Sequence, residues 1–216
     1  MSAESRALRC WEVHDFLVKN GDCLRDVAFL EAFVAPHCLF KKGGMRGSHL
    51  RIVQEPSELA QFFKMMADWE ICSYLEVGTS TGGSWFLIDS YLRAVNSRFS
   101  RSTGYDRKCK LREWPEYRAR FPSCEFRQKN SSSIQLGDEQ YDLTFIDARH
   151  EEEWAWHDFE RVRAHSRFVA FHDIVLPEPS TVSKFWQVAK HLYPSWEIIN
   201  QSRPVTCGIG ILQVRH

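Results

Sequence analysis

From residue 72 onward, short apolar runs typical of β-strands alternate with longer runs in which apolar residues recur at helical spacing. The strand-like runs are residues 72–77, 102–106, 124–128, 141–147 and 167–173, and the helix-like runs are residues 84–95, 151–165 and 181–193. Neighbouring parallel strands need a long crossover, usually a helix, so this alternation indicates parallel β-α-β units. We therefore expect an α/β fold with a Rossmann-like, doubly wound, mostly parallel sheet.

The last two strand-like runs, residues 196–200 and 208–214, break this alternation. Only the segment QSRPVTC lies between them, and no crossover helix fits into so short a connection. An antiparallel pairing is therefore expected for these two runs. The predicted sheet has seven strands, with an antiparallel strand at its C-terminal end.

The first part of the chain carries helical patterns only. Apolar residues recur at helical spacing twice within residues 7–39, which predicts two short helices. Residues 41–49 are rich in glycine and predict a loop, and Pro56 then marks the start of a helix that reaches about residue 69. We expect one domain over residues 1–216, with residues 1–56 as an N-terminal helical extension.

Composition excludes several classes of partner. Lysine plus arginine and aspartate plus glutamate each number 28, so no basic surface for a nucleic acid is indicated. No apolar run approaches the ~20 residues of a membrane span, and no apolar signal core follows the first methionine. The seven cysteines are odd in number and show no CxxC spacing, which favours free thiols in a reducing compartment. We expect a cytoplasmic protein that binds neither nucleic acid nor membrane.

The first strand-like run ends in a glycine-rich turn. Glu76 closes the run, and Gly78, Gly82 and Gly83 follow before the next helix. Ligands of open α/β sheets bind beyond the carboxyl ends of the strands, where glycines permit a tight turn and close approach of the backbone to a ligand. The spacing is neither GxGxxG nor that of a P-loop, which disfavours a nicotinamide enzyme. The alternative is a tight turn that binds nothing.

An acidic residue ends the next strand-like run. Asp106 lies about one β-α-β unit after the glycines, where a carboxylate can accept both hydroxyl groups of a ribose. By itself, Asp106 fits a solvated loop better than a ligand site. Its place after the glycine-rich turn favours a ligand.

Two further strand-like runs each end near one aspartate and one histidine. Asp147 ends one of them, with His150 just beyond it, and His172 and Asp173 end the next. If the two strands are adjacent, their ends lie ~5 Å apart, and two carboxylates and two imidazoles converge. Three interpretations remain open at this point: turn and helix-cap residues, a cation site, or acid/base residues without a metal.

The stretch from Glu76 to Ser84 resembles motif I of the class I S-adenosylmethionine-dependent methyltransferases. This resemblance implies that the turn binds the methionine end of the cofactor and that Asp106 binds its ribose. It places Asn130 and Ser131 near the adenine. The cofactor-binding residues that it implies are Glu76, Gly78, Thr79, Gly82, Gly83, Ser84, Asp106, Asn130, Ser131 and Asp147.

A larger resemblance covers residues 54–186. The stretches QEPSELAQFF, YLEVGTSTGGSW, YDLTFIDARHEEEWAWHDFE and VAFHDI followed by VSKFW occur in the order seen in small-molecule and sugar O-methyltransferases. That subgroup is similar to macrolide-sugar methyltransferases and cephalosporin hydroxylase-type proteins. The resemblance implies catalytic roles for Asp147 and for His150, the latter as general base, and a divalent cation, Mg²⁺ or Mn²⁺, on Asp147, His172 and Asp173. Residues before motif I often form a lid in this family, so residues 1–56 are expected to act as a lid as well as a helical extension.

The chain departs from its best-defined relatives at one position. They have Glu-Asp where this chain has His172-Asp173, and Mg²⁺ prefers oxygen ligands whereas imidazole suits zinc, iron or manganese better. Either the metal differs, or His172 turns away and the site is weaker, or the metal has been lost.

Taken together, these features predict a metal-assisted O-methyltransferase that acts on a hydroxyl group of a sugar, glycoside or other small polyol. Other acceptors, such as a catechol-like diol or a protein, stay open, because the acceptor pocket depends on loops. A catalytically inactive module with the cofactor fold is a further alternative. A homo-oligomer is compatible with the sequence.

Overall fold

The computed structural model describes residues 8–38, 50–176, 181–201 and 207–215. Its centre is a seven-stranded sheet in the order β3-β2-β1-β4-β5-β7-β6. The strands are β1 (Ser73–Val77), β2 (Arg101–Asp106), β3 (Cys124–Gln128), β4 (Tyr141–Ile146), β5 (Ser166–His172), β6 (Ser195–Ile198) and β7 (Ile209–Gln213). All pairs from β3 to β5 are parallel, and β7 is antiparallel to both β5 and β6. The predicted fold class is confirmed, including the antiparallel strand near the C-terminus.

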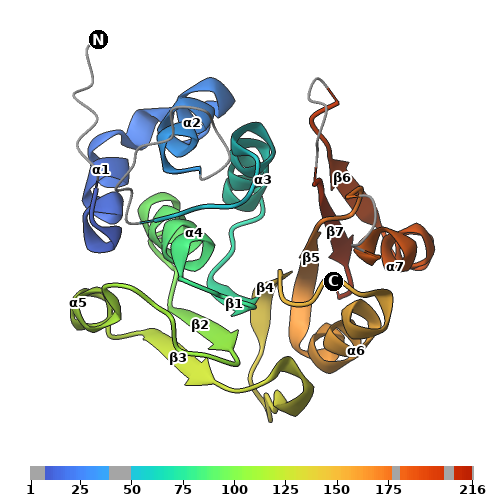
Figure 1. Ribbon diagram of the computed structural model, residues 1–216. Helices are drawn as coiled ribbons and strands as arrows, with labels where there is room; N and C mark the ends of the chain where they lie inside the picture. Colours follow the sequence, from blue (N-terminus) through green and yellow to red (C-terminus); the bar gives the residue numbers. More distant parts are fainter. Residues whose placement is uncertain (1–7, 39–49, 177–180, 202–206, 216) are drawn as a thin grey trace.

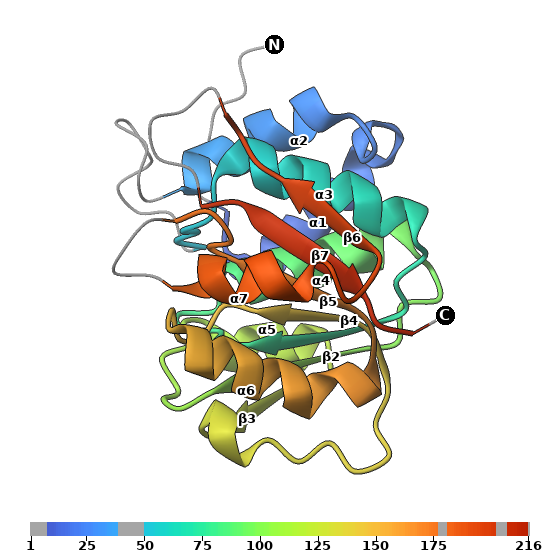
Figure 2. The same ribbon diagram turned by 90° about the vertical axis from the view of Figure 1, so that its right-hand side faces the viewer.

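Helices cover both faces of this sheet (Figures 1 and 2). The α-helices are α1 (Val13–Lys19), α2 (Val27–Val34), α3 (Pro56–Asp68), α4 (Gly83–Val95), α5 (Trp114–Arg120), α6 (Glu152–Val162) and α7 (Val182–Ala189). Short 3-10 turns lie at Cys10–Glu12, Gly21–Cys23, Ala35–His37, Ser131–Ser133 and Arg163–His165. Helices α3 and α4 lie on one face with α1 and α2 outside them, and α6 and α7 lie on the other face (Figure 1).

The N-terminal helices belong to the main core. Helix α1 packs against α4 and α2 packs against α3, so the two helices predicted within residues 7–39 are confirmed. Helix α3 begins where Pro56 predicts: Glu55 caps it by accepting hydrogen bonds from the backbone N–H groups of Ser57 and Glu58. The loop expected at residues 41–49, which is part of the predicted lid, lies outside the described residues.

Two elements differ from the sequence expectation. Helix α7 ends at Ala189, although the pattern predicts a helix as far as residue 193, because a turn precedes Pro194. Helix α5 has no counterpart in the prediction, since its seven residues are too few for a clear periodic pattern. Tertiary contacts hold it: the Tyr117 hydroxyl donates to Asp89 of α4 at 2.7 Å, and Arg93 donates to the same carboxylate.

The core consists of two apolar layers separated by the sheet. One layer joins α1–α4 to the sheet, with Trp85, Phe62 and Phe145 fully buried. The other joins α6 and α7 to the opposite face, with Trp186 and Phe159 buried. Strands β4 and β5 contribute to both layers, which explains their near-continuous apolar sequences.

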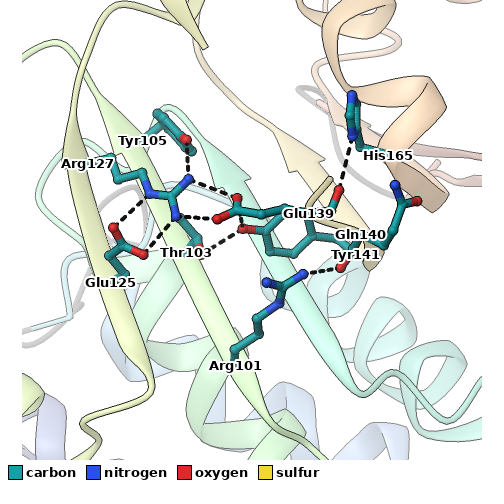
Figure 3. A network of polar contacts seen from close by, with 9 residues as sticks. All are labelled: Arg101, Thr103, Tyr105, Glu125, Arg127, Glu139, Gln140, Tyr141 and His165. Atoms are coloured by element: carbon teal, nitrogen blue, oxygen red, sulfur yellow. Dashed lines mark hydrogen bonds and ion pairs between the residues drawn. The ribbon is translucent and has the colours of Figure 1, made fainter. Parts of the chain in front are cut away.

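A polar network lies beside α6, on the sheet face that this helix covers (Figure 3). The register pairs Thr103 with Glu125 and Tyr105 with Arg127, so these side chains share one face of β2 and β3. The guanidinium of Arg127 donates to the Tyr105 hydroxyl at 2.7 Å and to Glu139 at 2.5 Å. This network ties β2 and β3 to the segment that leads into β4.

The described residues contain no helix that is both long and apolar enough to cross a membrane. All seven cysteines are free thiols.

Candidate active site at the carboxyl edge of the sheet

Two cavities open at the carboxyl ends of the central strands. The larger one, about 790 Å³, is lined by the turn after β1, the residues after β4, the end of β5 and the segment before α3. The smaller one, about 260 Å³, lies toward β2 and β3. Both are lined by Gly78, Ser80, Asp147 and Ala148, so they adjoin across the ends of β1 and β4. The structure therefore offers an elongated binding region at the edge that the sequence indicates.

The glycines of the turn are required mainly by the packing of the chain itself. Gly78 has φ +98°, and a Cβ atom there would overlap the backbone carbonyl of Asp147. Gly83 lies against the carbonyl oxygen of Leu50, which a Cβ atom would also overlap. Gly82 is the N-cap of α4, has φ +89° and lines neither cavity, whereas Gly78 and Gly83 line the larger one.

Polar groups of the turn differ in whether they face the cavity. Thr79 lines the larger cavity, and its buried hydroxyl has no hydrogen-bond partner among the described residues. Ser84 also lines it but donates to Glu76 at 2.7 Å. Glu76 is fully buried, accepts a second hydrogen bond from the Tyr74 hydroxyl, and lines neither cavity. Burial raises the pKa of Glu76 to about 8, although the hydrogen bonds from Tyr74 and Ser84 act against this.

The smaller cavity contains the other residues that the resemblance assigns to a cofactor. Asp106 accepts hydrogen bonds from the backbone N–H groups of Ser80 at 2.8 Å and Lys108 at 2.9 Å, which fixes the carboxylate at the cavity wall. Carboxylate oxygens have about four lone-pair sites in total, so Asp106 keeps the capacity to accept further hydrogen bonds. Asn130 and Ser131 line the same cavity.

The strand register brings the second group of residues together. Ile146 pairs with Phe171, so Asp147 and His172 come next on adjacent strands. The Nδ1 atom of His172 lies 3.4 Å from Oδ1 of Asp147 and 3.1 Å from Oδ1 of Asp173. His172 thus points into the cluster between the two carboxylates, which excludes the alternative that it turns away.

His150 reaches the cluster from the loop before α6. Its Nδ1 atom lies 2.5 Å from Oδ2 of Asp173, and its side chain is 54% exposed at the cavity. The hydrogen bond to Asp173 leaves Nε2 as the nitrogen that a bound substrate can reach. Asp173 orients this imidazole in the way that a carboxylate orients a catalytic histidine.

Mutual charges shift the pKa values in this cluster. The hydrogen bond to Asp173 raises the pKa of His150, and burial only partly opposes it. Burial alone would lower the pKa of His172, but the charge of Asp147 and the hydrogen bond to it raise that pKa well above its usual value. Burial alone would raise the pKa of Asp173, and the hydrogen bond from His150 and the charge of His172 outweigh it. Hydrogen bonding and ion pairing therefore outweigh burial at His150, His172 and Asp173.

The donor atoms present fit a divalent cation. Ligand atoms of Asp147, His150 and Asp173 lie within 4.8 Å of one another, as do those of His172, Asp173 and Cys207. Gln54 adds an amide: its Nε2 donates to Oδ2 of Asp147 at 2.6 Å, and its buried Oε1 has no partner among the described residues. Binding would release protons from the histidines, so the affinity would depend on pH.

Sequence patterns alone did not identify Gln54 and Cys207 as site residues. Gln54 precedes α3, and Cys207 precedes β7, so neither lies at the carboxyl end of a parallel strand. The only local signal for Gln54 is its place at the start of the QEPSELAQFF stretch. Within residues 1–56, where the resemblance implies a lid, Arg51 lines the larger cavity and His49 lies outside the described residues.

No protein-family model matches the chain, and no curated protein matches it. Solved structures do share its fold. A Klebsiella pneumoniae protein described as an O-methyltransferase is 15% identical, with 95% of this chain and 98% of that chain covered and a TM-score of 0.55. The O-methyltransferase TomG of Streptomyces achromogenes, involved in tomaymycin synthesis and solved with S-adenosylmethionine, is 14% identical over 76% of this chain and 82% of its own, with a TM-score of 0.54.

The O-methyltransferase of Bacillus cereus, solved with S-adenosylhomocysteine, gives a similar result. It is 15% identical, covers 94% of this chain and 98% of its own, and has a TM-score of 0.50. These likenesses show that the chain has the Rossmann-like fold of class I methyltransferases.

Proposed function

We propose that this protein is an S-adenosylmethionine-dependent O-methyltransferase that methylates a hydroxyl group of a sugar, glycoside or other small polyol. The observation that carries the proposal is the juxtaposition of two sites at one sheet edge. The His150–Asp173 pair lies in the same cavity as the glycine-rich turn, and the cavity that contains Asp106 adjoins it. The shared fold of O-methyltransferase structures solved with the cofactor or its product supports the same conclusion.

The cofactor is proposed to extend across both cavities. Asp106 would accept hydrogen bonds from the ribose hydroxyls, with Asn130 and Ser131 near the adenine in the smaller cavity. The methionine end would reach the larger cavity, where Thr79 offers a buried hydroxyl without a partner and the N-terminus of α4 favours a carboxylate. Glu76 is assigned an indirect part, because it supports Ser84 from within the core.

Methyl transfer needs an oxygen nucleophile that is aligned and loses its proton. When bound, S-adenosylmethionine supplies an activated methyl group. The substrate oxygen would form the new O–CH₃ bond as the S–CH₃ bond breaks, which leaves S-adenosylhomocysteine as the neutral thioether. His150 would accept the hydroxyl proton at Nε2, and Asp173 would stabilise the resulting imidazolium.

A divalent cation is proposed to assist the reaction. Asp147 and Asp173 would hold it together with a histidine of the cluster, and Gln54 would keep Asp147 oriented. Such an ion lowers the pKa of a bound hydroxyl group, which an unactivated sugar alcohol needs. Of the two ions that the resemblance implies, Mn²⁺ suits a mixed set of nitrogen and oxygen ligands better than Mg²⁺ does.

Calorimetric titration of the apo-protein tests the cofactor assignment. We expect S-adenosylmethionine and S-adenosylhomocysteine to bind and NAD to give no signal, because the turn lacks the dinucleotide spacing. Asp106→Ala should weaken the binding of both sulfur cofactors by at least about tenfold, since it removes a charged hydrogen-bond acceptor. Asp138→Ala, at an exposed aspartate that lines neither cavity, is the matched control. A folded wild-type protein that binds neither sulfur cofactor would refute the proposal.

A further inference from the structure

The cluster contains a thiol in addition to carboxylates and imidazoles. Cys207 precedes β7, the antiparallel neighbour of β5, and His172 pairs with Ile209 in that register. Beyond this pair, the backbone N–H of Val175 donates to the carbonyl of Cys207 at 3.1 Å, which holds the two segments together. As a result, one ligand atom each of His172, Asp173 and Cys207 lies within 4.8 Å of the other two.

An unpartnered buried nitrogen gives independent evidence for a ligand at this cluster. His172 lines the larger cavity and is only 4% exposed, yet its Nε2 atom has no hydrogen-bond partner among the described residues. A buried polar atom without a partner costs about 1–3 kcal/mol, so folded proteins rarely keep one unless something else satisfies it. A metal ion bound at Nε2 would remove this cost, while Nδ1 stays with the carboxylates of Asp147 and Asp173.

We infer that the cation proposed above is Zn²⁺ and that Cys207 takes the place of Asp147 among its ligands, so that His172, Asp173 and the thiolate of Cys207 hold it. Sulfur, nitrogen and one carboxylate oxygen form a ligand set that suits zinc and that Mg²⁺ avoids. Three protein ligands leave the fourth tetrahedral position open, as in catalytic zinc sites. His172, at the position where the resemblance implies an acidic residue, would then indicate a different metal and not the loss of the site.

The zinc site is compatible with the base proposed above. Asp173 presents Oδ1 to His172 at 3.1 Å and Oδ2 to His150 at 2.5 Å. One oxygen can therefore bind the ion while the other orients His150. The purpose of the ion depends on the proposed methyl transfer, but its binding and its ligands can be tested without any methyl acceptor.

Cobalt substitution tests the sulfur ligand directly. The chelator-treated full-length protein is titrated with CoCl₂ under argon, and the near-ultraviolet absorption is recorded. Thiolate ligation gives a sulfur-to-cobalt charge-transfer band, and oxygen or nitrogen ligands do not. We expect the band in the wild-type protein, its displacement by ZnCl₂ and its loss in Cys207→Ser. Cys38→Ser, which changes the other thiol of the same cavity, should keep it.

Zinc affinity provides the second measurement. Calorimetry with ZnCl₂ should show a loss of about 10–100-fold or more in Cys207→Ser and in His172→Asn, because even second-shell changes cost that much. Circular dichroism of each variant checks that it is folded.

Four results would overturn the inference. They are cobalt binding without a charge-transfer band, a band that persists in Cys207→Ser, a band lost in Cys38→Ser, and a folded wild-type protein that binds neither ion. The first would place the cation on oxygen and nitrogen ligands without Cys207 and leave the proposed methyl transfer intact. In contrast, failure to bind S-adenosylmethionine would refute the proposed function and leave the zinc assignment standing.

Discussion

Asp173 is the residue on which the chemistry of the site converges. It follows directly after β5 with φ +66°, a left-handed conformation that costs a non-glycine residue of order 1–3 kcal/mol. In this conformation its two oxygens face different histidines, His150 and His172. A carboxylate between two imidazoles would keep one oriented as the proposed base and leave the other available to the proposed cation.

His150 is the residue that we expect to be the proton acceptor. His150→Gln should lower kcat by about 10²–10⁴-fold, because a positioned general base typically contributes that much. The affinity for S-adenosylmethionine should stay the same, since the residues assigned to the cofactor are unchanged. Single-turnover kinetics and calorimetry measure the two quantities. His191→Gln, at an exposed histidine away from both cavities, should affect neither. Equal kcat in His150→Gln and the wild-type protein would assign the base elsewhere.

Glu76 should make the free energy of unfolding depend on pH. Its pKa is about 8 in the folded protein and near 4.5 when exposed, so the folded state retains a proton between these values. The unfolded state has then lost this proton, and stability from this group falls as pH rises from about 4.5 to 8. The slope is up to about 1.4 kcal/mol per pH unit.

Glu76→Gln removes this titration. The stability of the variant relative to the wild-type protein should therefore increase with pH across this range and level off above pH 8. Urea denaturation at several pH values measures the difference, and Glu70→Gln at an exposed glutamate is the control. A difference that does not change with pH would show that Glu76 is already ionised in the folded state.

At the scale of elements, the site depends on the way strands β1, β4, β5 and β7 end side by side. Parallel strands β1, β4 and β5 deliver Gly78, Asp147 and His172 to one edge, and the antiparallel β7 starts at that edge and delivers Cys207. The glycine-rich turn then crosses the end of β4, where Gly78 contacts the backbone after it. Chain packing and the proposed ligand binding thus constrain the same turn.

Substitutions at Gly78 and Gly137 should separate the energetic cost of a left-handed backbone conformation from the cost of steric overlap. Gly78→Ala places a Cβ atom into the backbone of Asp147, whereas Gly137→Ala, also at a positive φ, meets nothing within 4 Å. We expect Gly137→Ala to cost about 1–2 kcal/mol from backbone conformation alone. Gly78→Ala should cost a further 1–3 kcal/mol or so from overpacking. Urea denaturation compares the two, and equal losses would show that the turn relaxes away from β4.

At the scale of the whole molecule, the N-terminal helices and the last strands close the core around the site. Glu58 of α3 is fully buried and accepts hydrogen bonds from the backbone N–H groups of Asn200 and Gly208. Residues more than 140 positions apart are therefore joined beside the larger cavity. Such closure makes ligand binding and global stability interdependent.

Cofactor binding should accordingly stabilise the entire domain. S-adenosylhomocysteine at 100 times its Kd should raise the free energy of unfolding by about 2.7 kcal/mol, if it binds only the folded state. Thermal unfolding at increasing ligand concentration measures this effect, and Asp106→Ala should shift the concentration at which it appears. A Tm that stays constant with saturating ligand would exclude a cofactor site within the folded domain.

The sequence by itself determined the order of the elements and the identity of the polar residues at the strand ends. Strand alternation, helical spacing and the residues that end each run are local properties, and they suffice to assign Asp106, Asp147 and the His172–Asp173 pair to one sheet edge. The same reasoning missed α5, because its seven residues are held by contacts with α4 and not by a pattern of their own.

Only the tertiary structure decided which other groups reach that edge and which way they face. Gln54 lies 93 positions from its partner Asp147, and Cys207 joins the cluster because β7 lies antiparallel beside β5. Glu76 ends its strand as predicted, but the direction of its side chain places it in the core and not at the cavity. Strand order, register and side-chain direction arise from packing between distant segments, so no local pattern could have supplied these three placements.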